Sequence, residues 1–163
     1  MSPDSTDPRV YLPPDKEEVI AFLGEQGPFE TRAGVIAFAA AYGYREGQRE
    51  SFERGTKDIR WSVFQEEGKS FIADLIAAAE VADLAIMRDE RGPDRRQIFA
   101  EYANGGLMLL RDRVMDNPRD PLEVILEMLL AVEEPRDVTT TEGLGKLVAE
   151  MEREKASRPT VQD

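Results

Sequence analysis

Two adjacent glycines, Gly105 and Gly106, lie in the middle of a segment whose other residues have helical spacing, QIFAEYANGGLMLL at residues 97–110. Each glycine in a helix interior costs about 1 kcal/mol relative to alanine, so a pair is expected where another backbone comes close or the helix bends. Gly106 shares a helical face with apolar and aromatic residues, namely Phe99, Tyr102, Ala103, Leu110 and Val114. We therefore expect a second helix to cross closely at Tyr102, Gly105 and Gly106.

Apolar residues recur with helical periodicity along most of the chain. Together with helix start and stop signals, they predict helices at about residues 15–23, 31–44, 69–87, 94–115, 122–132 and 141–155. The predicted helix caps are Asp15, Asp94 and Asp120, and Asp83 marks a break or an edge in the apolar stripe of 69–87. The segment 122–132 is apolar almost all round, which is typical of a central helix or a subunit interface. The sequence thus predicts an all-α fold, a compact bundle of about five to six helices in one domain.

Residues 59–64 fit two kinds of structure. Their apolar residues alternate as in a strand, but Ile59, Val63 and Phe64 also fit one turn of a helix. We favour a short helix, because the sequence offers no second strand to pair with this one.

The length of 163 residues suits one domain with a sizeable core. Residues 1–14 contain four prolines and little apolar content, and residues from about 153 onward are polar. We therefore expect a flexible N-terminal segment at 1–14, a single helical domain at 15–152 and a flexible tail at 153–163.

The chain is acidic, with a net charge of −12, and contains neither cysteine nor histidine. Its charge opposes general attraction to phosphate backbones or anionic lipid. The missing residues exclude disulfides, thiolate metal sites and every Ser-His or Cys-His dyad. We find no membrane span and no signal peptide. The sequence predicts a cytoplasmic, non-enzymatic protein with no membrane contact, no cofactor and no metal.

Four arginines cluster around one turn of the chain and are the candidate partner-binding residues: Arg88, Arg91, Arg95 and Arg96. A local positive patch of this kind can hold a phosphate or an acidic partner surface within an acidic protein. The alternative is a set of solvated arginines paired with neighbouring carboxylates.

Carboxylates are abundant, and three of them could be nominated for a metal-dependent hydrolase: Asp74, Glu80 and Asp83. Their spacing carries no specific information, because 33 acidic residues must place some of them three or four positions apart. A solvated face explains them better.

Several short motifs occur in order between about residues 15 and 132: GPFET at 27–31, FAAAYGY at 38–44, Ile59-Arg60 followed by Val63-Phe64, and IFAEYANGGL at 98–107. Together they resemble the DNA phosphorothioation-associated protein 4 family. These are small bacterial proteins encoded beside the genes that place sulfur in the DNA backbone or use that mark against phage. The resemblance implies a function in such a modification and restriction system, and it supplies no catalytic residue.

Our first hypothesis is a non-enzymatic accessory protein of this antiphage system that binds other proteins of the system. Four questions stay open: which protein it binds, whether it acts in modification or in restriction, whether it forms a homodimer, and whether it contacts DNA directly.

The alternative is a small dimeric DNA-binding regulator of ribbon-helix-helix type. In it residues 59–64 would pair as a strand with their twin, and Arg60 and Ser62 would face DNA. The acidic charge opposes this alternative.

Overall fold

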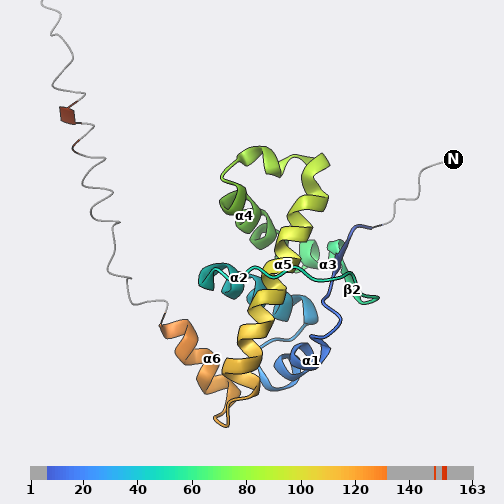
Figure 1. Ribbon diagram of the computed structural model, residues 1–163, viewed down its shortest axis with the longest axis vertical. Coiled ribbons are helices and arrows are strands. Elements are labelled where there is room, and N and C mark those ends of the chain that lie inside the picture. The colour runs from blue at the N-terminus through green and yellow to red at the C-terminus, as the bar shows by residue number, and fades with distance from the viewer. Residues whose placement is uncertain (1–6, 132–148, 150–151, 154–163) are drawn as a thin grey trace, which may run out of the picture. The chain divides into compact units, whose positions relative to one another are not determined.

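Helix α5 (Gly92–Leu110) is the longest helix in the part of the chain that the structure describes. The structure is a computed structural model that describes residues 7–131, 149 and 152–153. The chain divides into two units, residues 1–126 and 127–163. In the first unit, α5 runs through the middle of the helices and α2 (Arg32–Glu46) crosses it (Figure 1). Beyond Leu110 the helix continues as one π-helical segment, Arg111–Met115.

Four further α-helices are seen among the described residues, and they confirm the predicted all-α bundle. They are α1 (Glu17–Gln26), α3 (Trp61–Glu66), α4 (Ser70–Val81) and α6 (Pro121–Leu130). Two short 3-10 turns, η1 (Leu84–Met87) and η2 (Asp89–Arg91), connect α4 to α5. None of the described helices has the length and apolar character needed to cross a bilayer. The predicted helix at 141–155 and the tail at 153–163 lie almost entirely outside the described residues.

Helices α2 and α5 cross at backbone distance, and glycine makes this approach sterically allowed. A Cβ atom added to Gly106 would lie 2.6 Å from the carbonyl carbon of Ala39, and one added to Gly43 would lie 2.8 Å from the amide nitrogen of Gly106. Neither distance is compatible with a side chain, because both neighbours are backbone atoms. The apolar face of α5 is accordingly buried, from Phe99 to Leu110.

Two three-residue strands form the small sheet of the first unit. Strand β1 (Arg9–Tyr11) pairs antiparallel with β2 (Asp58–Arg60), and Val10 lies opposite Ile59. The favoured helix over 59–64 is therefore wrong for its first two residues, because a strand partner exists. The predicted flexible segment 1–14 is also wrong for residues 9–12, since Val10 and Leu12 are buried in the core.

The observed pairing also removes the structural basis of the ribbon-helix-helix alternative. Strand β2 uses residues 9–11 of its own chain as partner instead of a twin strand. The hydroxyl of Ser62 donates to a carboxylate oxygen of Asp7 at 2.5 Å, and the Ser62 amide donates to the other carboxylate oxygen at 3.3 Å. Ser62 thus holds the chain before β1 in place.

The helix start signals succeeded where the side chain caps the helix directly. Thr31 accepts a hydrogen bond from the Gly34 amide at 3.0 Å, and Asp120 accepts one from the Leu122 amide at 2.8 Å. Asp15 makes no such cap, because its carboxylate pairs with Lys16 instead. At α5 the helix begins at Gly92, two residues before the predicted cap Asp94, with proline in its first turn.

Helix α6 is buried on one side only. Val124 and Ile125 are buried, whereas Leu122 and Leu126 at the end of the first unit are about half exposed. In the second unit Leu129 and Leu130 are exposed to a similar extent. This helix is therefore not a central helix within the described residues, and its apolar sequence leaves four leucines exposed.

Candidate functional site

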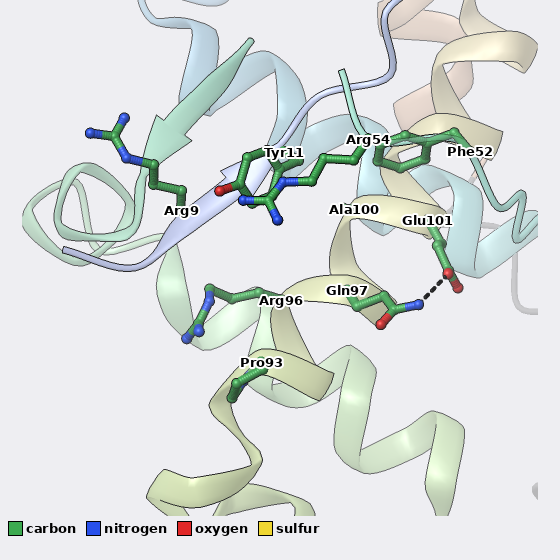
Figure 2. Close-up of a pocket in the computed structure, with 9 residues that line it drawn as sticks. All are labelled: Arg9, Tyr11, Phe52, Arg54, Pro93, Arg96, Gln97, Ala100 and Glu101. Carbon is green, nitrogen blue, oxygen red and sulfur yellow. Dashed lines mark hydrogen bonds between the residues drawn. The ribbon is translucent and has the colours of Figure 1, made fainter. Parts of the chain in front are cut away.

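A cavity of about 390 Å³ lies beside the N-terminal half of α5 (Figure 2). It is bounded by strand β1, by the loop between α2 and β2, and by one face of α5. Its volume falls in the range of small-molecule sites. The residues that line it are Arg9, Tyr11, Phe52, Arg54, Pro93, Arg96, Gln97, Ala100 and Glu101.

Backbone hydrogen bonds fix the loop that forms one wall of the cavity. The Glu50 amide donates to the Glu101 carbonyl at 3.1 Å, and the Asn104 side chain donates to the Glu50 carbonyl at 3.1 Å. A Cβ atom added to Gly105 would lie 2.7 Å from the carbonyl carbon of Gln48. The glycine pair thus has two different neighbours: Gly106 admits α2, and Gly105 admits the loop that carries Phe52 and Arg54.

Aromatic rings hold the arginine side chains of the cavity. The Arg54 guanidinium carbon lies 3.5 Å from the centre of the Tyr11 ring, and Figure 2 shows the side chain extended along that ring. On the facing helix the Arg96 guanidinium lies 6.0 Å from the centre of the Trp61 ring. Such contacts orient a guanidinium and leave its N–H groups free for other acceptors.

The positive charges of the cavity are only partly neutralised. Arg9 pairs with Asp58 at 2.6 Å, whereas Arg54 and Arg96 form no ion pair with any residue in the described part of the chain. Burial and the neighbouring charge of Arg95 lower the pKa of Arg96 below its ordinary value. The cavity therefore presents two guanidinium groups that lack a carboxylate partner among the described residues.

A network of charged and polar side chains borders the cavity at Glu101. Arg49 bridges two carboxylates, with its Nε 2.6 Å from Glu101 and its Nη1 2.9 Å from Glu80. The Tyr102 hydroxyl donates to Glu80 at 2.5 Å, and this bond lowers the pKa of Glu80. Burial and the Glu80 carboxylate raise the pKa of Tyr102 to about 12. The network links the loop, α4 and α5, and it also engages the one carboxylate that lines the cavity.

The four arginines predicted to bind a partner differ in what they contact. Arg95 donates to the carbonyl oxygens of Ile86 and Arg88 at 2.6 and 2.8 Å and lies 2.9 Å from Asp74. Arg91 pairs with the nearby Asp94 at 2.5 Å, and Arg88 is exposed. Arg96 alone among the four lines the cavity.

The carboxylates considered for a metal site are each engaged separately. Asp74 faces Arg95, Glu80 binds Arg49 and Tyr102, and Asp83 accepts a hydrogen bond from the Ala85 amide at 2.8 Å. Asp83 also marks the predicted break, since α4 ends at Val81. Within residues 7–131, 149 and 152–153, no three acidic side chains are grouped so that they could hold a metal ion.

Arg96 is the one lining residue that was predicted to bind a partner. The lining residues outside α5 were all missed: Arg9, Tyr11, Phe52 and Arg54. The first two lie in the proline-rich start of the chain, and the other two lie in a segment of mixed charge. One signal could have indicated a binding site: the aromatic Phe52 lies two positions before Arg54, in a segment without helical periodicity.

A second surface feature is an exposed group of large apolar side chains on α4 and η1. Phe71 and Leu75 lie one helical turn apart on α4 and are 58% and 63% exposed. Leu84 of η1 is 78% exposed, and Met87 is 42% exposed. We call Phe71, Leu75, Leu84 and Met87 the α4–η1 surface. Exposed apolar side chains that lie together mark interaction sites on soluble proteins.

Comparison with known families gives one match. The family model described as DNA sulphur modification system-associated protein 4 matches residues 9–147. Neither a curated protein nor a solved structure matches the chain. The matched range includes β1, the loop, all six helices and both surface features described above.

Proposed function

Because the chain belongs to the family of DNA sulphur modification system-associated protein 4, we propose that it is a non-enzymatic accessory protein of that system. In this proposal it acts in the cytoplasm, in antiphage defence, by binding another protein of the system through the α4–η1 surface. The observation that carries the proposal is the exposure of Phe71, Leu75 and Leu84, in a unit whose other large apolar residues on α2 and α5 are mostly buried. Removal of such side chains from water drives protein association.

The charge around this surface favours a different protein over a second copy of the chain. Exposed acidic residues outnumber exposed arginines around it in the sequence: Glu66, Asp83, Asp89 and Glu90 against Arg88 and Arg91. Two copies would bring these charges and two net charges of −12 together, which opposes association. We therefore propose a partner with an apolar patch and a basic rim.

The residue chemistry supports an accessory function. The sequence has no histidine and no cysteine, so it lacks the usual general base and the thiolate nucleophile. The carboxylates at positions 74, 80 and 83 each hold a structural partner.

The test is direct binding between the purified chain and each purified protein encoded with it. Leu75→Gln combined with Leu84→Gln should abolish binding measured by calorimetry while the circular dichroism spectrum and melting temperature stay unchanged. The matched control is Leu122→Gln, which removes a leucine of similar exposure from α6 and should bind normally.

Two outcomes would contradict the proposal. Equal loss of binding in Leu122→Gln would assign the contact to α6. A dimer in light scattering that the double substitution dissociates would assign the α4–η1 surface to self-association.

A further inference from the structure

The cavity beside α5 combines two features that the packing of the fold does not require. It exposes the guanidinium groups of Arg54 and Arg96, which have no ion pair in the described part of the chain. It is also lined by the rings of Tyr11 and Phe52. We infer that this cavity binds a nucleotide, with the phosphate at the two guanidinium groups and the base against the aromatic wall.

The guanidinium groups suit a phosphate by charge and by shape. Arginine presents planar, paired N–H donors that match phosphate oxygens, and it stays charged at neutral pH. The Arg54 guanidinium carbon lies over the Tyr11 ring, 3.5 Å from its centre, so the side chain is positioned before a ligand arrives. Burial and Arg95 lower the pKa of Arg96, and the charge of an anion bound there would favour the protonated guanidinium.

The aromatic wall distinguishes a nucleotide from a phosphate alone. Bases stack on aromatic side chains and on guanidinium planes, and each stack contributes substantially to nucleic-acid binding. Figure 2 shows the Tyr11 ring and the Arg54 side chain on one side of the cavity, with Arg96, Pro93 and Gln97 on the helix opposite. Because Arg54 covers the Tyr11 ring, the base would stack on the Phe52 ring and the Arg54 plane, a contact that a phosphoserine cannot make.

The size and the overall charge limit the ligand to about one nucleotide. The cavity holds about 390 Å³, which suits a small ligand. A net charge of −12 opposes a long backbone contact. The same chemistry admits a free nucleotide or a single nucleotide of a DNA strand. None of the cavity residues belongs to the α4–η1 surface, so this inference does not depend on the proposed protein contact.

The experiment is calorimetry of the full chain at low salt. The two nucleotide ligands are thymidine 5′-monophosphate and a five-nucleotide thymidine strand, made with or without phosphorothioate linkages. The comparison ligands are thymidine, inorganic phosphate and phosphoserine. We expect thymidine monophosphate or the strand to bind at least tenfold more tightly than thymidine, phosphate or phosphoserine. Binding of the monophosphate identifies a free nucleotide as the ligand, and binding of the strand alone identifies DNA. Trp61 is the single tryptophan of the chain and contacts Arg96, so its fluorescence should change on binding.

Variants separate the two parts of the cavity. Arg54→Gln and Arg96→Gln should each weaken nucleotide binding about tenfold or more. The matched control Arg60→Gln removes an exposed charge from β2 outside this cavity and should bind normally. Phe52→Leu should weaken binding of the nucleotide and leave binding of phosphate unchanged.

The inference is overturned if neither the monophosphate nor a strand binds to the folded protein. It is also overturned if phosphoserine binds as tightly as the nucleotide, or if Arg60→Gln weakens binding as much as Arg54→Gln and Arg96→Gln do.

Discussion

Two faces of α5 differ in what they contact. One face meets α2 through backbone atoms at Gly106, where no side chain fits. The other face carries Pro93, Arg96, Gln97 and Ala100, and it lines an open cavity. The comparison shows how one helix serves as scaffold and as site. A backbone contact fixes its position, and the cavity face can then present Arg96 and Gln97 beside the buried Ala100.

The glycine pair joins these two faces. Gly106 admits α2, and its neighbour Gly105 admits the Gln48 carbonyl at the start of the loop that carries Phe52 and Arg54. Both contacts place backbone against backbone. The cavity wall is therefore held by the same local feature that sets the helix crossing.

The largest effect should come from filling the crossing. Gly106→Ala would place a Cβ atom 2.6 Å from the Ala39 carbonyl carbon, so α2 and α5 must move apart. We expect a loss of about 3 kcal/mol in the free energy of unfolding, measured with urea. The matched control is Gly24→Ala in α1, where an added Cβ meets nothing within 4 Å. That change should stabilise the protein by about 0.5–1 kcal/mol. Equal effects at the two positions would refute the close crossing.

The next effect concerns Arg95, beside the cavity face. Arg95→Met leaves the carbonyl oxygens of Ile86 and Arg88 without their donor and removes the partner of Asp74. We expect a loss of about 2 kcal/mol. Arg91→Met removes only an exposed pair with Asp94, so its effect should stay below about 0.5 kcal/mol. If both variants unfold at the same urea concentration, the contacts of Arg95 contribute no more to stability than the exposed pair of Arg91.

A smaller effect should come from the hydroxyl of Tyr102, which connects α5 to α4. Tyr102→Phe removes the hydrogen bond to Glu80 and should cost about 1 kcal/mol at pH 8. The control Tyr44→Phe changes a more exposed tyrosine and should cost less.

The same tyrosine predicts a pH dependence. Its pKa rises from an ordinary value near 10 to about 12 in the folded protein. The unfolded chain therefore loses the proton first, and the stabilisation present below pH 10 is lost as the pH rises toward 12. Urea unfolding at pH 8 and pH 11 should show a larger decrease for the wild-type protein than for Tyr102→Phe. An equal decrease in the two proteins would contradict the shift.

The helices could be predicted because their signals are local. Apolar periodicity located most of them, and side chains such as Thr31 and Asp120 mark helix starts that are also observed. The glycine pair indicated a close approach before any partner was known. Asp15 failed as a start signal because Lys16, its immediate neighbour, competes for the carboxylate.

The sheet and the cavity could not be predicted, because they depend on contacts between distant segments. The strand pattern at residues 59–64 was rejected for want of a partner, because β1 has only three residues and the prolines around it suggested a flexible segment. The cavity gathers residues from positions 9 to 101, and no sequence pattern indicates that these distant segments meet. The predicted arginine group was close in sequence, but only Arg96 turns toward the cavity.

The smallest effect on stability should come from the arginines that line the cavity. Arg54 and Arg96 have no ion pair in the described part of the chain, and the lowered pKa of Arg96 means that folding disfavours its charged form. Arg96→Gln should therefore change the free energy of unfolding by less than about 0.5 kcal/mol, because the lost contact with Trp61 is offset by removal of a disfavoured charge. Arg54→Gln should cost about 0.5–1 kcal/mol, since it loses the contact of an exposed guanidinium with Tyr11. Urea unfolding beside Gly106→Ala gives the comparison directly. A loss above about 1 kcal/mol in either arginine variant would show that the cavity face stabilises the fold as the α2 face does. A near-zero value means that these side chains are held in place at little benefit to the fold, as expected of residues that serve a ligand.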